Sequence, residues 1–378
     1  MSEWTEFASA LLRWYHKNKR DLPWRGTADP YAIWISEIMA QQTRITALLP
    51  YYQKFMDLFP CVEDLAAAPE ESVLKAWEGL GYYARARNLR KAARLIVEQH
   101  QGKLPADKQA LLALPGVGAY TAGAILAIAY GIPEPAVDGN VLRVFARMEN
   151  SAAPVDLPET RECAATFVRE NMPADQASAF TQALMELGAL ICLPKQPLCG
   201  ECPGGGYPTA ALCQARRLGL EKKLPHRLPK PEKKICEKIV FLIISPSGGI
   251  LCRKRTENLL RGLWEFYVIE APGNCPSDHS DSRPDNCPDN CPELARVLRE
   301  AGFHPLGEPT AAGEREHVFT HLIWRMQGWI CFAADEKPPD ALTDYVFLSR
   351  EALTQVPVAS ALAFYRGVAL AVLSQPVN

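Results

Sequence analysis

The hydrophobic periodicity of the chain changes once, and this change is the feature that most limits its possible folds. Through residues 1–215 apolar residues recur at intervals of three and four and are interrupted by Pro and Gly, which is typical of packed helices. After a segment rich in Lys, Arg and Pro at 216–236, the run IVFLII at 239–244 predicts a buried strand, followed by a turn at 245–249 and a second strand at 250–252. The pattern predicts an all-α region, an exposed linker and an α+β region at 237–378.

Bulk properties agree with two folded regions and exclude some classes of protein. The 378 residues exceed what a single hydrophobic core usually supports, and the net charge of −2 gives no whole-chain attraction for nucleic acid. Any basic surface is therefore local. The start of the chain lacks the basic and apolar segments of a secretory signal, and the most apolar stretch, at 122–130, is too short to span a bilayer. We expect a cytoplasmic monomer with no signal peptide and no membrane partner.

A tight turn with two glycines stands within the helical region. The sequence LPGVG at 114–118 ends one apolar segment and begins a helix of small residues, so a hairpin of two helices is expected at about 111–125. Gly116 and Gly118 let the backbone approach a phosphate, and the first-turn amides of the new helix point toward it. This predicts a sequence-independent DNA contact. A plain helical hairpin explains the residues equally well.

Two carboxylates occupy unlike settings and form a candidate catalytic pair. Glu37 lies among the apolar residues of WISEIMAQQT (34–43), where burial would raise its pKa and suit it to act as a general acid. Asp138 precedes a helix in VDGN (137–140), where first-turn amides would hold it ionised next to developing positive charge. Cleavage of an N-glycosidic bond needs such a contrast. Taken singly, Asp138 could be only a helix cap and Glu37 only a solvent-facing residue.

Cysteines cluster at the end of the helical region. Cys192, Cys199, Cys202 and Cys213 have ligand-like spacing, and four thiolates could bind zinc or an iron–sulfur cluster. The residues at 204–211 interrupt the last interval and indicate an insertion that is looped out. A second insertion at 272–292 is poor in hydrophobic residues, and we interpret it, with Cys275, Cys287 and Cys291, as a surface loop.

These motifs together resemble the MutY adenine DNA glycosylases of the helix-hairpin-helix superfamily. The resemblance is carried by WISEIMAQQT (34–43), GLGYYARARN (79–88), LPGVG (114–118) and VDGN (137–140), and it covers residues 1 to about 220 and, more loosely, the rest. It implies base excision repair of adenine paired with 8-oxoguanine or guanine in duplex DNA, in a bacterial-type, nucleoid-associated enzyme. It also implies that Glu37 protonates adenine N7 and that Asp138 stabilises or captures the sugar cation, a retaining course.

Further site residues follow from the same resemblance. Tyr120 and Asn140 would assist catalysis, whereas Arg25 and Gln182 would line the base pocket. Gln42, Thr43 and Tyr82 would contact the duplex, with Gln42 and Tyr82 wedged into the space left by the flipped adenine. Related bifunctional enzymes place a Lys, which forms a Schiff base, where Tyr120 stands here. Tyr120 therefore predicts base removal without efficient strand cleavage.

The resemblance also extends to the cysteines and to the C-terminal region. It implies a [4Fe–4S] cluster in a module at about 186–215, although the family usually has a shorter interval before its last cysteine. The sequence GLWEF at 262–266 looks like a Nudix-type domain, but the following helix offers only Glu293 and Glu300, so nucleotide hydrolysis is not expected. The family reads the lesion through Phe-Ser-His, and here this loop is Phe319, Thr320 and His321.

Three functions therefore compete: a monofunctional adenine glycosylase, a bifunctional pyrimidine or oxoguanine glycosylase, and a silent binding module for damaged DNA. Tyr120 argues against the second function, because it cannot form a Schiff base. The pair Glu37 and Asp138 argues against the third, because binding alone needs no acid. The sequence favours the first.

Overall fold

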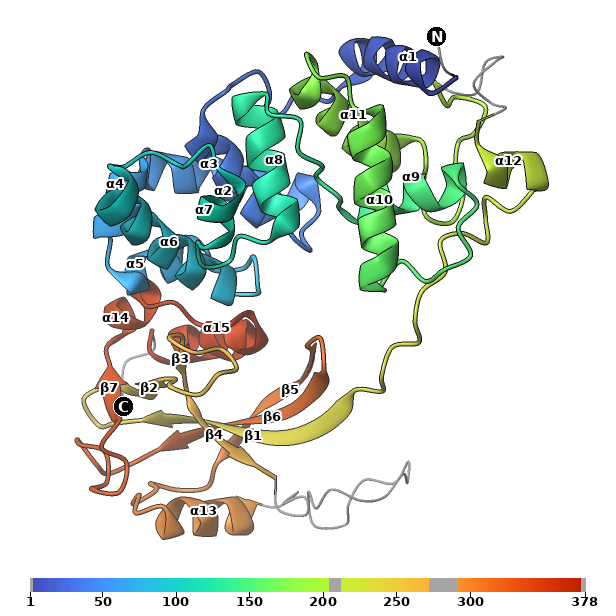
Figure 1. Ribbon diagram of the computed structural model, residues 1–378. Coiled ribbons are helices and arrows are strands. Elements are labelled where there is room, and N and C mark those ends of the chain that lie inside the picture. The colour runs from blue at the N-terminus through green and yellow to red at the C-terminus, as the bar shows by residue number, and fades with distance from the viewer. Residues whose placement is uncertain (1–2, 204–211, 272–290, 375–378) are drawn as a thin grey trace. The chain divides into compact units, whose positions relative to one another are not determined.

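The computed structural model describes residues 3–203, 212–271 and 291–374, and it forms two compact units (Figure 1). The helical unit comprises Met1–Ala68 and Arg87–Pro229, and the C-terminal unit comprises Pro69–Ala86 and Lys230–Asn378. The two predicted insertions, at 204–211 and through most of 272–292 with Cys275 and Cys287, lie outside the described residues. No helix within the described ranges combines the length and the apolarity needed to cross a lipid bilayer.

Helix α11 is the centre of the helical unit. It packs against α1, α8 and α9, while α2 packs against α8 and α3. Side chains such as Phe7, Phe145 and Phe180 form the apolar cluster between α1, α9, α10 and α11. The helices of this unit are α1 (Glu3–Asn18), α2 (Pro30–Ala40), α3 (Ile45–Leu58), α4 (Val62–Ala67), α6 (Ala84–His100), which begins in the C-terminal unit, α7 (Lys108–Leu112), α8 (Ala119–Tyr130), α9 (Gly139–Met148), α10 (Pro158–Asn171), α11 (Ala177–Leu190) and α12 (Gln214–Leu218).

Local sequence explains where the central helices begin and how closely they pack. Asp29 accepts hydrogen bonds from the first-turn amides of α2, and Pro30 occupies a position where no amide donor is needed. Every residue from Tyr31 to Met39 is buried, which explains the continuous apolar character of this helix. In α8, a Cβ atom on Gly123 would lie 2.2 Å from the carbonyl oxygen of Pro135, so the segment before α9 can approach only because glycine stands there.

The C-terminal unit is built on one mixed sheet with helices on both faces (Figure 1). Strand β1 runs parallel to β6 and antiparallel to β2 and β4, and the main order is β3-β2-β1-β6-β5, with β7 paired to β2. The elements are α5 (Glu70–Ala76), β1 (Lys234–Ile244), β2 (Ile250–Lys254), β3 (Trp264–Glu265), β4 (Tyr267–Glu270), α13 (Cys291–Glu300), β5 (Thr310–Val318), β6 (Leu322–Phe332), β7 (Tyr345–Leu348), α14 (Arg350–Gln355), the 3-10 turn Ser360–Leu362 and α15 (Ala363–Val372).

Strand β1 is buried on both faces over residues 239–244, as the continuous apolar run there predicted. Val240 and Leu242 face a core with Tyr365 of α15, whereas Phe241 faces a second core with Leu298 of α13. A strand covered on both sides has no polar face, so the alternation of a half-exposed strand is missing from the sequence. The predicted turn at 245–249 and the second strand are likewise present.

Two features differ from the sequence-based expectation. The segment predicted as linker at 216–236 contains the end of α12 and the start of β1, with a turn at 221–223 and backbone without helix or strand from 224 to 233. Residues Pro69–Ala86 group with the C-terminal unit although they lie within the predicted helical region. Glu78 explains this grouping, because it accepts a hydrogen bond from the Val358 amide at 2.9 Å and from the Arg366 guanidinium at 2.6 Å. Such pairing across 280 residues leaves no local signal.

Candidate active site

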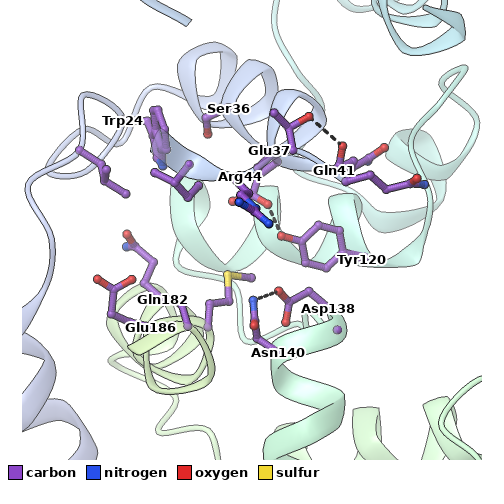
Figure 2. A pocket seen from close by; sticks show the side chains of 18 of the residues that line it. Trp24, Ser36, Glu37, Gln41, Arg44, Tyr120, Asp138, Asn140, Gln182 and Glu186 are labelled. Carbon is purple, nitrogen blue, oxygen red and sulfur yellow. Dashed lines mark hydrogen bonds between the residues drawn. The ribbon is translucent and has the colours of Figure 1, made fainter. Parts of the chain in front are cut away.

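A pocket of about 940 Å³ opens in the helical unit, between α2, α8, the start of α9 and α11. It contains eight of the residues singled out in the sequence, drawn from four helices and three loops. They are Arg25, Glu37, Gln42, Thr43, Tyr120, Asp138, Asn140 and Gln182. Figure 2 shows Tyr120 directed at Glu37, with Asp138 and Asn140 below them and with Gln182 and Glu186 along α11. The fold thus assembles in one cavity residues that lie far apart in the sequence.

Glu37 is a buried carboxyl group, and only 8% of its residue surface is exposed. Burial raises its pKa to about 7, and the nearby Asp138 adds to the rise, whereas a hydrogen bond donated by Tyr120 and the charge of Arg25 oppose it. The predicted rise is therefore confirmed, and its main cause is desolvation on the apolar helix α2. Burial also raises the pKa of Tyr120 well above its usual range, so the phenol stays protonated and donates a hydrogen bond to Glu37.

Asp138 caps α9 as the sequence predicted. Its carboxylate accepts hydrogen bonds from the Val141 amide and the Asn140 side chain, both at 2.7 Å. Its pKa, however, is raised, because burial outweighs the two hydrogen bonds and the charge of Arg143. The predicted cap is therefore present, but its hydrogen bonds do not lower the pKa of Asp138 below its usual value. The difference between the two carboxyl groups lies in their partners: Asp138 has several donors, and Glu37 has one.

Arg143 anchors the start of α9 from behind. Its guanidinium donates to the Asn140 side chain at 2.8 Å, to the Gly188 carbonyl at 2.7 Å and to the Cys192 carbonyl at 2.6 Å. A Cβ atom on Gly188 would lie 2.5 Å from that of Asn140, so α11 and α9 meet closely at this point. Arg143 and Gly188 therefore fix the orientation of Asn140, which in turn holds Asp138.

The two predicted wedge residues share an unusual backbone conformation. Gln42 has φ of 58° and Tyr82 has φ of 48°, which is the left-handed region that residues other than glycine seldom adopt. Both side chains are exposed. Beside Tyr82, the Arg85 guanidinium lies 5.6 Å from the Tyr82 ring and 5.2 Å from the Trp77 ring, and it donates to the Gly81 carbonyl. Strain of this kind concentrates at functional sites.

The two-glycine turn has the predicted form. It connects α7 to α8, and Gly116 has φ of 80° while Gly118 caps α8 in extended conformation. A Cβ atom on Gly116 would lie 2.9 Å from that of Asn88, whereas one on Gly118 would meet nothing within 4 Å. Gly116 is thus required by the turn itself. Gly118 leaves open space at the start of α8, where a phosphate could approach the amides.

The four cysteines of the helical unit line a separate cavity of about 150 Å³. Cys213 lies on it together with Cys192, Cys199 and Cys202, although a long interval separates it from Cys202 in the sequence. Arg147 donates to the Cys192 sulfur at 3.1 Å, and the Cys213 thiol donates to the Arg147 carbonyl at 3.5 Å. Among the described residues no three His, Cys, Asp or Glu side chains converge closely enough to hold a single metal ion. Four thiols at one cavity fit the donor set of an iron–sulfur cluster and also that of a structural zinc ion.

In the C-terminal unit the predicted recognition loop joins β5 to β6. Phe319 packs edge-on against Trp324 and His317, with ring centroids 5.0 Å and 4.6 Å away. Thr320 and His321 are exposed, and the Thr320 hydroxyl lies 3.3 Å from the Tyr82 hydroxyl within the same unit. Phe319 therefore holds the loop to the sheet, while the polar side chains of Thr320 and His321 stay at the surface.

Comparison with known proteins covers both units. The model of the HhH-GPD superfamily of base excision DNA repair proteins matches residues 35–167, and the NUDIX domain model matches residues 239–363. The adenine DNA glycosylase of Mus musculus is 41% identical over 386 residues, which cover 88% of this chain and 72% of the mouse protein. This chain belongs to the adenine DNA glycosylase family.

Other relatives match a shorter part of this chain. The human adenine DNA glycosylase is 41% identical over 226 residues, which cover 57% of this chain and only 40% of the human protein. A solved structure described as a thermostable thymine-DNA glycosylase has a TM-score of 0.52 and 30% identity, and covers 57% of this chain and 97% of its own. The comparisons confirm the predicted fold class, a helix-hairpin-helix core followed by a Nudix-like α+β region.

Sequence reasoning missed Glu186, Arg143 and Gly188. Glu186 lines the pocket from α11 and is completely buried with two arginines. No motif includes it, and it follows the superfamily match, which ends at residue 167. The available signal was its spacing, because a residue four positions after Gln182 lies on the same face of a helix.

Proposed function

We propose that this protein is a monofunctional glycosylase of base excision repair that removes adenine paired with 8-oxoguanine or guanine in duplex DNA. The observation that carries the proposal is the enclosure of Glu37, Tyr120, Asp138 and Asn140 in one pocket. Glu37 is poised to protonate the leaving base, since its pKa of about 7 keeps much of it in the acid form at neutral pH. Asp138 is placed to stabilise the sugar cation or to capture it, with retention.

The choice of base and of reaction rests on further features. The base is proposed to be adenine because the relatives are adenine DNA glycosylases. Tyr120 stands where the resemblance places the lysine of bifunctional enzymes, and a phenol cannot form a Schiff base with the sugar. Arg25 and Gln182 line the same pocket and would contact the flipped adenine. Base removal without efficient β-elimination is therefore proposed.

The test is incubation of the protein with duplexes that carry A opposite 8-oxoguanine or A opposite G, followed by analysis with and without alkali. Breakage of the adenine strand only after alkali supports the proposal. Breakage without alkali would identify a bifunctional enzyme. Binding without any abasic product would identify a silent damage-binding module.

Lesion recognition is proposed for the exposed groups of the C-terminal unit and of the wedge. Thr320 replaces the family's usual serine and keeps the hydroxyl that can bond to the lesion, with Phe319 and His321 around it. Gln42 and Tyr82 would fill the space left by the flipped adenine, and Thr43 would contact the duplex next to Gln42. This assigns base removal to residues 1–215 and lesion reading to residues 237–378, joined through 216–236. We further propose that the protein acts as a cytoplasmic, nucleoid-associated monomer.

We propose that Cys192, Cys199, Cys202 and Cys213 hold a [4Fe–4S] cluster. The four thiols at their cavity, with the cations of Arg147 and Arg216 beside them, suit an anionic cluster. The cluster would brace the module and a basic surface near DNA, and it would supply no chemistry at the base.

The pH dependence of adenine release tests the role of Tyr120. The general acid must be protonated, so the rate should fall about tenfold per pH unit above the pKa of Glu37, about 7. The hydrogen bond from Tyr120 lowers this pKa, so Tyr120→Phe should raise it and move the alkaline limb to higher pH. Hydrogen bonds to charged groups contribute about 1.5–3 kcal/mol, which corresponds to about 1–2 pH units. Single-turnover rates measured across pH check this, and a limb that stays in place or moves to lower pH contradicts it.

Exposed arginines at the pocket mouth predict phosphate contacts. Arg161 of α10 lines the pocket and forms no ion pair with any described residue, so its charge is available to the backbone beside a flipped nucleotide. Arg161→Gln should weaken binding of all duplexes alike and reduce the slope of log K against log salt by about 0.9. Arg169→Gln is the matched control, because Arg169 is exposed on the same helix outside the pocket. An equal slope in both variants would refute the contact.

A further inference from the structure

Among the carboxyl groups that line the pocket, that of Glu186 accepts the most hydrogen bonds. Its side chain is completely buried, and it accepts hydrogen bonds from the amide, Nε and Nη2 of Arg20 at 2.9, 2.9 and 2.7 Å. It also accepts from Nη1 and Nη2 of Arg25 at 2.9 and 2.5 Å. These bonds hold the pKa of Glu186 at about 2 against the effect of burial, so it remains an anion. One carboxylate therefore holds two guanidinium groups.

Arg25 is fixed on several sides. Besides the bidentate pair with Glu186, it donates to the Arg20 carbonyl at 3.0 Å, and its guanidinium lies 5.6 Å from the Tyr15 ring. Only 9% of its side chain is exposed. The Tyr15 hydroxyl in turn donates to Gln182 at 3.1 Å. A flexible side chain that would otherwise sample many rotamers is thus held in one place at the base pocket.

The position of Arg25 matters because of the charges that face Glu37. Tyr120 of α8 and Asp138 at the start of α9 face it, Arg25 approaches from the loop before α2, and Arg44 lines the same pocket at the start of α3. The charge of Arg25 lowers the pKa of Glu37 without an ion pair between them, since Glu186 binds both ends of the Arg25 guanidinium. An arginine released into this pocket would find Glu37 as an anionic partner and would keep it ionised.

We propose that Glu186 is a positioning residue that holds Arg25 within reach of the bound base while keeping it away from the general acid Glu37. The inference rests on the proposed function, because it concerns the protonation of the acid in that reaction. Arg20 contributes a second cation to the same carboxylate, which leaves the wall with one excess positive charge facing the pocket. In this arrangement the cation of Arg25 can lie at the base pocket while the general acid Glu37 stays protonated.

The decisive variant is Glu186→Gln, which keeps the size of the side chain and removes the charge that holds Arg25. Released Arg25 should lower the pKa of Glu37. In the plot of single-turnover rate against pH, the fall of the rate on the alkaline side should therefore move to lower pH. A shift of one pH unit lowers the rate above the limb about tenfold. In Arg25→Gln/Glu186→Gln the limb should return toward its original position, although the rate stays low because Arg25 is gone. Glu134→Gln is the control, since it removes a carboxylate that pairs with Lys108 outside the pocket.

A purely structural role predicts another result: a loss of rate at every pH, with the limb unmoved and with no return in the double variant. That outcome overturns the inference. The pKa of Glu37 can also be read in the free protein from the carboxyl 13C shift, so a failure here is distinguishable from an inactive wild-type enzyme. If Glu186→Gln does not fold, Glu186→Asp keeps the charge but withdraws it from Arg25, and the same shift, smaller in size, is expected. An unmoved limb in a folded Glu186→Asp protein would also count against the proposal.

Discussion

Glu37→Gln is expected to slow adenine release by about 10²–10⁴-fold, the usual contribution of a general acid, while duplex binding stays close to that of the unaltered protein. Glutamine has the same shape and keeps an oxygen that can accept the hydrogen bond of Tyr120. It has no proton to give to the departing base. Because Glu37 is buried on α2, a neutral replacement also avoids any new desolvation cost, so the fold should be retained.

The measurement pairs single-turnover excision on an A·8-oxoguanine duplex with a binding titration on the same duplex. Glu98→Gln makes the same chemical change at an exposed position of α6 and should alter neither quantity. Excision that remains within a few-fold of the unaltered protein would remove Glu37 from the role of general acid. A parallel loss of binding would show that the change disturbs the pocket and not only the proton.

The sequence was sufficient where the signal is local. The apolar neighbours of Glu37 predicted a raised pKa, and the order of residues around Asp138 predicted a helix cap. The run at 239–244 predicted a buried strand. Each depends on residues within one or two turns or on one strand, so no distant partner had to be known.

The sequence was insufficient where a distant partner decides the outcome. Burial in the folded pocket raises the pKa of Asp138, and the residues next to Asp138 in the sequence do not indicate this burial. In the sequence, Glu186 has no feature that distinguishes it from other polar residues of α11. Its partners Arg20 and Arg25 lie more than 160 residues earlier. The parallel pairing of β1 with β6 joins residues such as Phe241 and Trp329, whose proximity no local pattern shows.

The second large effect is expected in the cysteine module. Arg147→Met should reduce the free energy of unfolding by about 4 kcal/mol or more, because the Arg147 side chain is almost completely buried and donates to four acceptors. These are the carbonyls of Leu224, Leu193 and Pro194 at 3.1, 2.8 and 2.9 Å and the Cys192 sulfur at 3.1 Å. Methionine fills much of the space but donates no hydrogen bond, so each buried carbonyl would lose its partner.

Denaturant unfolding measures the loss, and iron and sulfide content per chain reports on the proposed cluster. Arg217→Met changes an exposed arginine of the neighbouring α12 and should affect neither. An unfolding free energy equal to that of Arg217→Met would show that the Arg147 contacts do not stabilise the module. Arg147→Lys separates charge from geometry: it keeps the cation beside the thiols but cannot reproduce the planar fork that serves three carbonyls and a sulfur at once. We expect it to retain more iron than Arg147→Met and still to unfold more easily than the unaltered protein, because the carbonyls are held by the shape of the guanidinium and the thiols by its charge.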